Sequence, residues 1–387
     1  MGVAPAALFL AFAATCHAGE LHSAVRAGDR KLVEKLLDAG ASPNEPDALG
    51  GTPLHDAAWA GDVAIARLLI ERGAGVDARH REAGSTPLHY AVITNHTAVA
   101  ALLLDHRADV KATYQSGSAA LHLAANRGYR DMIDLLLSRG ADIHQRDASG
   151  ASALDEAAWK GQGEVARILL ERGAKFSPAT FWQAVQKGHS AVVVLPVEAG
   201  ADPNQSGGEE GTPVEMALRY RQRAVAELLL AKGAGLTGQQ RDKALKSAVL
   251  RGEADIVDLL LQRGGDPSSV LHDAALKGHV AIVTLLLARG ARVEAAGATG
   301  SRALHDAALG GHAPVVELLL DRGADIHAAD SDTGATALHL AASYGRRNVL
   351  LLLLDRGADS KRTNKAGKTA REAALESGQN EMAALLP

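Results

Sequence analysis

A leucine–histidine pair recurs along this chain at a period of 33 or 34 residues, and this period constrains the fold more than any other feature. The histidines of the recurring pair are His22, His55, His89, His122, His272, His305 and His339. A fixed period of this length is typical of repeat proteins, in which each repeat is one supersecondary unit that packs on its neighbours. The length of 387 residues also favours an array, because a single globular core stops growing at roughly 250–300 residues.

The clearest copies of the repeat carry the start and stop signals of two short helices. One copy reads GTPLHDAA from position 51. Thr52 suits a helix N-cap, Pro53 suits the first helical turn, and Gly61 is placed to end the helix. A second apolar stretch over 63–71 ends before Gly73. Two helices of this size cannot bury their apolar faces alone, so the pattern predicts that the repeats stack.

These residues resemble the ankyrin family, whose repeat carries the signature Thr-Pro-Leu-His. The resemblance implies an all-α ankyrin-repeat solenoid, built of helix-turn-helix units with short hairpin-like finger loops. It assigns residues 19–387 to an array of about twelve repeats, which begin near positions 21, 52, 86, 119, 152, 179, 212, 243, 269, 302, 336 and 369. The signature histidine is expected to form hydrogen bonds with backbone groups between repeats.

The array is predicted to be irregular around residues 155–270. The signature position steps by only 27 residues from Asp155 to Trp182, and by only 26 from Lys246 to His272. The missing residues fall in the finger loop, so the sixth and ninth repeats should lack one. Pro196 falls within the second helix of the sixth repeat, where it predicts a kink or a shortened helix.

Residues 1–18 predict a signal peptide that is cleaved after Ala18. This stretch contains no Asp, Glu, Lys or Arg, and an apolar run from Val3 ends at Cys16, the only cysteine of the chain. The alternative is a hydrophobic cap on the first repeat. The Ala-, Arg- and Gly-rich composition suggests a bacterial source, and a periplasmic or secreted location follows. No other apolar run reaches 18–20 residues, so we expect no membrane insertion after cleavage.

The sequence offers no set of residues for catalysis, and we expect no enzyme activity, no cofactor and no metal. The signature histidines lie on different helices, which pack roughly 8–10 Å apart, too far to share one zinc ion with ligands about 2 Å away. Gly367-Lys368-Thr369 resembles the end of a phosphate-binding loop, but Arg362 stands where that motif requires glycine. The net charge of −4 gives no reason to expect nucleic acid as a partner.

The resemblance implies that a partner protein contacts the fingers and the exposed ends of the first helices. Mapping these ends onto the sequence gives a ladder of cations about one repeat apart, and several aromatic side chains. Exposed Trp, Tyr and Arg dominate the energy of interfaces. The candidate protein-binding residues are Trp59, Arg127, Trp159, Lys160, Lys187, Arg219, Tyr220, Arg251, Lys277 and Tyr344.

Three functions are compatible with this pattern. The first is an exported, monomeric, non-catalytic scaffold whose concave basic and aromatic groove binds a partner with an acidic segment. The second is a secreted effector, or an inhibitor or immunity protein that blocks another protein's active site. The third, from another class, is a hydrolase with a site in the irregular middle, which requires an acid, a base and a nucleophile together. Alternatively, the basic residues of the ladder only keep the groove hydrated and bind no partner.

Overall fold

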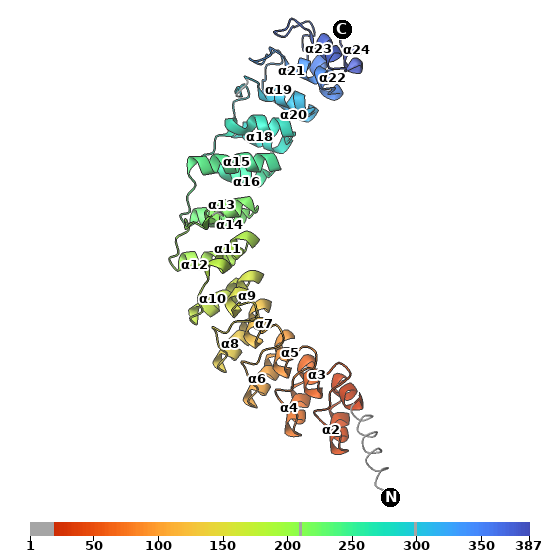
Figure 1. Ribbon diagram of the computed structural model, residues 1–387, viewed down its shortest axis with the longest axis vertical. Helices are drawn as coiled ribbons and strands as arrows, with labels where there is room; N and C mark the ends of the chain where they lie inside the picture. Colours follow the sequence, from red (N-terminus) through yellow and green to blue (C-terminus); the bar gives the residue numbers. More distant parts are fainter. Residues whose placement is uncertain (1–18, 209–210, 298–299) are drawn as a thin grey trace. The chain divides into compact units, whose positions relative to one another are not determined.

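The computed structural model describes residues 19–208, 211–297 and 300–387 (Figure 1). The predicted signal peptide at residues 1–18 lies outside the described residues. Every regular element among the described residues is a helix, and isolated β-bridges such as Thr113 with Ala119 and Arg146 with Ser152 join the two sides of finger loops. The predicted all-α class with helix-turn-helix units and hairpin-like fingers is therefore confirmed.

Each repeat contributes a first and a second helix. The first helices are a helix over 19–26, then α3 (Pro53–Ala60), α5 (Pro87–Ile93), α7 (Ala120–Arg127), α9 (Ala153–Lys160), α11 (Pro178–Lys187), α13 (Pro213–Arg219), α15 (Gly238–Arg251), α17 (Leu271–Lys277), α19 (Ala303–Gly310), α21 (Ala337–Ser343) and α23 (Ala370–Glu376). The second helices are α2 (Arg30–Asp38), α4 (Val63–Glu71), α6 (Thr97–Asp105), α8 (Arg130–Ser138), α10 (Gly163–Glu171), α12 (Ser190–Glu198), α14 (Arg223–Ala231), α16 (Ala254–Gln262), α18 (Val280–Ala288), α20 (Ala313–Asp321), α22 (Arg347–Asp355) and α24 (Asn380–Ala384). A 3-10 turn, η2 (Pro267–Val270), leads into α17.

The helices form two compact segments, an N-terminal segment that ends at Asp202 and a C-terminal segment that begins at Pro203. Within each segment, first helices pack on first helices and second helices pack on second helices, as α7 does on α9 and α16 does on α18. The core of each repeat is a small set of fully buried apolar side chains, such as Leu54, Ala57 and Leu69. The core therefore lies between successive repeats rather than at one centre.

The signature histidine joins the start of one first helix to the next repeat. The backbone N–H of Thr52, at the N-cap of α3, donates to Nδ1 of His55 over 3.1 Å. The opposite nitrogen, Nε2, donates to the carbonyl oxygen of Ser85 over 3.1 Å. His339 repeats this arrangement, with Nε2 3.1 Å from the carbonyl oxygen of Lys368. The prediction that these histidines bond to backbone groups between repeats is confirmed for His55, His122, His305 and His339, whereas Nε2 of His89 has no hydrogen-bond partner among the described residues.

The glycine that ends a first helix has two tasks. Gly61 has φ of +75°, a left-handed conformation that other residues adopt at a cost. A Cβ at this position would also lie 2.5 Å from the ring of His96, which begins the second helix of the next repeat. The close approach lets Nε2 of His96 donate to the carbonyl oxygen of Trp59 over 3.1 Å. The glycine therefore opens space for a second tie between repeats.

The structure tests two expectations about the irregular middle of the chain. Only residues 172–177 separate α10 from α11, whereas residues 139–152 separate α8 from α9, so the sixth repeat lacks a finger. Of the kink or shortening predicted at Pro196, the shortening does not occur, because α12 has nine residues, as α10 does. Pro196 lies in the last turn of α12, so it removes only one helical hydrogen bond, the one to the carbonyl of Val192.

Alanine substitution at two helix-ending glycines separates backbone strain from the steric clash. Gly73→Ala should lower the free energy of unfolding of the N-terminal segment by about 1–2 kcal/mol, because φ is +89° but no atom lies within 4 Å of the added Cβ. Gly61→Ala should cost more, since its Cβ meets the His96 ring. Urea denaturation followed by circular dichroism measures both. Equal losses for the two variants would show that the glycine space plays no part in stacking.

Candidate functional site

The predicted protein-binding residues form two patches at the C-terminal ends of first helices. We call Trp59, Arg127, Trp159, Lys160 and Lys187 the N-terminal patch. Their helices, from α3 to α11, follow one another in a single row of packed first helices. All five side chains are exposed, and Trp59 and Trp159 expose 55% and 43% of their surface. Large aromatic side chains are usually mostly buried, so these two stand out on the surface.

The other five predicted residues, Arg219, Tyr220, Arg251, Lys277 and Tyr344, form the C-terminal patch. They lie at the ends of α13, α15, α17 and α21 and are also exposed, with Tyr344 at 56%. The two patches belong to different segments of the chain. The predicted ladder of cations is therefore described as two sets of three, each on consecutive packed first helices.

Trp159 is the centre of the N-terminal patch. The ammonium nitrogen of Lys160 lies 5.1 Å from the centroid of the indole ring, and that of Lys187 lies 5.2 Å from it. Both distances suit cation–π attraction, which restricts the two flexible side chains. Lys187 comes from α11, so this contact joins two repeats. Among the described residues, neither lysine forms an ion pair with a carboxylate, so both charges remain available to a ligand.

A row of aromatic rings extends from Trp59, and the sequence did not predict it. The indole of Trp59 meets the ring of Tyr90 edge-on, with centroids 5.9 Å apart. Tyr90 in turn stacks on His80 of the preceding finger, with centroids 6.1 Å apart and ring planes at 24°. The rings connect the end of a first helix to a finger loop. The repeat pattern placed Tyr90 after the signature histidine, but only the finger geometry brings His80 onto it.

Arg251 of the C-terminal patch is already part of an internal ion pair. Its Nε and Nη2 donate to the two carboxylate oxygens of Glu253, over 2.7 and 2.9 Å. Glu253 is buried and also pairs with Arg221. This carboxylate fixes the guanidinium of Arg251 and compensates part of its charge. Arg251 is thus a weaker isolated cation than its position in the repeat suggests.

The signature histidines exist in two charge states. His55 accepts a hydrogen bond at Nδ1 from a backbone N–H, so its one proton is on Nε2 and the ring is neutral. Burial lowers the pKa of His55, and it lowers the pKa of His89 to about 4. His305 and His339 also have lowered pKa values, with burial as the largest cause. These rings form part of the neutral core.

His22 and His272 differ, because both of their nitrogens face acceptors. Nδ1 of His272 lies 2.6 Å from a carboxylate oxygen of Asp306, and Nε2 lies 2.9 Å from the carbonyl oxygen of Ala295. Neither group can donate, so the ring carries two protons and a positive charge. The hydrogen bond to Asp306 is the main cause of the raised pKa of His272. Burial lowers the pKa of His22, but the hydrogen bond and charge of Asp56 outweigh it and raise the value.

In three repeats the signature residue is cationic. In each of these cases the next repeat has an aspartate directly after its own signature residue. His22 pairs with Asp56 and His272 with Asp306, while Lys246 fills the same slot opposite Asp273, 3.6 Å away. Two of the three, Lys246 and His272, lie on first helices that no normal finger precedes, α15 and α17. His272 is the second residue of α17, whereas His55 is the third residue of α3, and Nδ1 of His272 meets the carboxylate of Asp306 in place of an N-cap backbone N–H.

The cluster of His22, Asp47 and Asp56 has ligand atoms within 4.8 Å of one another, a spacing that a metal ion could use. Arg26 already occupies this space, since its guanidinium pairs with both carboxylates. The two nitrogens of His22 are also both used as donors. Two cations and two carboxylates therefore balance, and a metal ion would have to displace Arg26.

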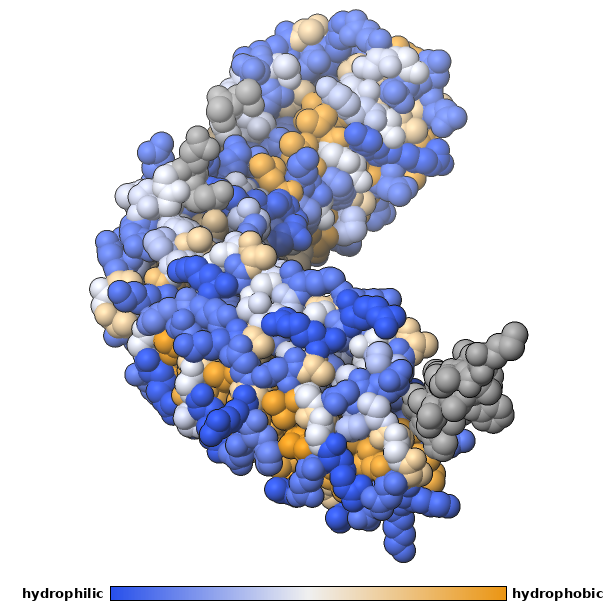
Figure 2. All heavy atoms as spheres, turned by 60° about the horizontal axis from the view of Figure 1, so that its bottom comes forward, coloured by the Kyte–Doolittle hydropathy of each residue, from blue (hydrophilic) through white to orange (hydrophobic). Residues whose placement is uncertain are grey.

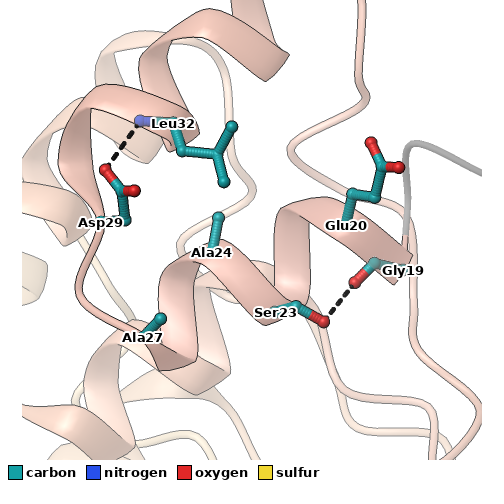
Figure 3. Close-up of a pocket in the computed structure, with 7 residues that line it drawn as sticks. All are labelled: Gly19, Glu20, Ser23, Ala24, Ala27, Asp29 and Leu32. Carbon is teal, nitrogen blue, oxygen red and sulfur yellow. Dashed lines mark hydrogen bonds between the residues drawn. The ribbon is translucent and has the colours of Figure 1, made fainter.

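A cavity at the N-terminal face of the first repeat offers no catalytic set (Figure 3). Two of its three polar side chains are engaged locally. The hydroxyl of Ser23 donates to the carbonyl oxygen of Gly19 over 2.8 Å, and a carboxylate oxygen of Asp29 accepts from the backbone N–H of Leu32 over 3.0 Å. The third, Glu20, is exposed.

The surface in the view of Figure 2 is mostly hydrophilic, and hydrophobic side chains show between the charged ones in separate patches. Among the described helices, none combines the length and the apolar character that crossing a bilayer requires.

A family model described as ankyrin repeats matches this chain five times, over residues 21–114, 108–179, 181–270, 264–330 and 327–386. Short segments are also similar to curated proteins. One is 43% identical over 58 residues to the mouse (Mus musculus) RelA-associated inhibitor, and another is 45% identical over 60 residues to human (Homo sapiens) neurogenic locus notch homolog protein 4. A third is 46% identical over 54 residues to an ADP-ribosylation factor GTPase-activating protein of Arabidopsis thaliana.

In each comparison the matching segment is a small part of this chain and a small part of the relative. They cover 15%, 15% and 14% of this chain, and 7%, 3% and 7% of the three relatives, in the same order. The similarity therefore extends over one or two repeats, and the activities of the relatives as whole proteins do not carry over with it.

Replacing Asp306 by Asn tests the charged state of His272. The variant should lose about 1–2 kcal/mol of unfolding free energy at pH 6 and less at pH 9. The folded pKa of His272 lies above its ordinary value of 6.5. Stabilisation from the pair is therefore complete below pH 6.5 and is lost as the pH rises through the folded value. Urea midpoints at both pH values, with the exposed Asp332→Asn as control, measure this. A loss that is independent of pH would contradict a charged His272.

Proposed function

The chain belongs to the ankyrin-repeat family, and on this premise we propose that it is a non-catalytic scaffold that binds the acidic segment of a partner protein. The exposed ends of its first helices supply the binding surface. The observation that carries the proposal is Trp159, an exposed indole with the ammonium nitrogens of Lys160 and Lys187 at 5.1 and 5.2 Å from its ring centroid. A flat apolar surface flanked by two positive charges is complementary to an aspartate or glutamate with its aliphatic stem.

The contacts of the two lysines support binding in a second way. Immobilising a flexible side chain at an interface costs about 0.5–1.5 kcal/mol. Lys160 and Lys187 already lie against the indole in the free protein, so part of this cost is met before the partner arrives. The chain of rings from Trp59 to His80 similarly supplies rigid apolar area that a partner can cover.

The hydrolase alternative lacks support among the described residues. Its site would require a base beside a nucleophile in the middle of the chain. Ser247 lines a cavity there with Glu215, but Glu215 uses its carboxylate to cap α13, with Oε2 2.8 Å from the backbone nitrogen of Thr212. Blocking another protein's active site remains a special case of the proposed function, because an inhibitor would use the same surface.

Charge reversal on the N-terminal patch tests the proposal. Peptides selected by phage display on the purified chain should be rich in Asp and Glu, and Lys160→Glu/Lys187→Glu should weaken their binding about tenfold or more. The matched control is Lys31→Glu/Lys35→Glu, which makes the same charge change on exposed residues of the second helix α2. Fluorescence anisotropy measures the affinities, and circular dichroism checks the fold. Equal affinity of the patch variant and the wild type would refute the proposal.

We also propose that the scaffold acts outside the cytoplasm, in the periplasm or after secretion. The support is the uncharged, apolar composition of residues 1–18. N-terminal sequencing of the protein purified from the cells that make it is expected to begin at Gly19. A protein that keeps residues 1–18 in the native host would contradict export by cleavage.

A further inference from the structure

A small cavity of about 100 Å³ lies between α13 and α15 in the C-terminal segment. The residues that line it come from one face of each helix. On α15 they include Gln240, Lys243, Ser247 and Arg251, whose spacing of three or four residues places them in one line. On α13 they include Glu215 and Arg219, one turn apart.

The cavity depends on a local departure from the repeat. α15 has 14 residues, whereas α13 has seven. No finger precedes α15, and Thr237 caps it, six residues after the end of α14. The additional N-terminal turns of α15 carry Gln240 and Lys243. They provide a wall that a repeat with a normal finger would not have.

Cationic and donor groups dominate the walls. Lys243 is exposed, and no described carboxylate forms an ion pair with it. Arg251 uses Nε and Nη2 for Glu253, so Nη1 is the nitrogen that this pair does not use. Gln240 accepts at Oε1 from the backbone nitrogen and hydroxyl of Thr237, both over 2.9 Å, which leaves its amide N–H groups as the donors for the cavity.

The one carboxylate in the lining is occupied. Oε2 of Glu215 accepts from the backbone nitrogen of Thr212 over 2.8 Å and from its hydroxyl over 3.1 Å. These bonds cap α13 and hold the carboxylate at the start of that helix. The lining therefore places the ammonium group of Lys243 and one nitrogen of Arg251 in the same cavity, while the carboxylate of Glu215 keeps its charge but is turned toward the N-cap of α13.

We propose that this cavity is an anion subsite that takes one aspartate or glutamate carboxylate of the partner. The inference rests on the proposed function and adds an independent anion contact on the C-terminal segment of the chain. Charge-assisted hydrogen bonds from a lysine, an arginine nitrogen and an amide suit a carboxylate. The hydroxyl of Ser247 supplies one further donor at the same wall.

The test uses the full chain and a fluorescein-labelled hexaglutamate peptide at about 20 mM salt, where screening of exposed charges is weak. Lys243→Gln should weaken binding about threefold or more, and Ser247→Ala should weaken it to a lesser extent. Lys31→Gln, an equal charge change on α2, should leave the affinity unchanged. Amide NMR shifts on peptide addition should include Ser247. Equal binding by the wild type and Lys243→Gln would overturn the assignment.

Two further measurements separate a carboxylate site from a phosphate site, and failure of this proposal from failure of the proposed function. A Gly-Ser hexapeptide with one phosphoserine that binds more tightly than hexaglutamate, with the same dependence on Lys243, would overturn the carboxylate assignment in favour of a phosphate. Lys160→Glu/Lys187→Glu is measured with the same hexaglutamate peptide. If that variant weakens binding and Lys243→Gln does not, the cavity proposal fails while the proposed function stands. If neither variant weakens binding, both proposals fail.

Discussion

The hydrogen bond from a signature histidine to the backbone of the next repeat is the interaction on which this structure depends. A pair of short helices cannot bury its apolar faces alone, so each repeat is stable only while it is held in register with a neighbour. The imidazole does this with both nitrogens, as His55 accepts from the N-cap of its own helix and donates to Ser85. One side chain therefore starts a helix and sets the position of the following repeat.

In the eighth and ninth repeats, which depart from the pattern, the same position carries a charge, on Lys246 and on His272. His272 follows a 3-10 turn in place of a finger, and it pairs with Asp306 instead of a backbone N–H. The hydrogen bonds of a buried neutral histidine are weakened when the ring is protonated, whereas the pair of a charged histidine with an aspartate forms only when the ring is protonated. The array thus contains histidine ties with opposite responses to pH, and raising the pH above 6.5 weakens only the pairs of His22 with Asp56 and of His272 with Asp306.

Much of the fold could be predicted from local signals, because the residues that begin and end each helix lie within the repeat itself. Thr52, Pro53 and Gly61 mark the ends of α3 as the structure has them. Of the kink or shortening predicted at Pro196, the shortening did not occur, since a proline in a last turn removes one hydrogen bond and α12 still packs on α10 and α11. The charged histidines could not be predicted from one repeat, because the deciding carboxylate belongs to the next one. The stacking of His80 on Tyr90 likewise depends on the path of a finger loop.

The candidate site shows why a repeat position alone does not define a binding residue. Lys187 and Arg251 fill the same slot, at the end of a first helix, yet their charges have different surroundings. Lys187 lies against the indole of Trp159, which attracts the ammonium group without neutralising it. Arg251 lies against Glu253, a buried carboxylate that compensates its charge but fixes its direction. The lysine therefore offers charge to a flat surface, and the arginine offers a directed donor to a cavity. The same repeat position thus supplies two different kinds of cationic surface on one repeated scaffold.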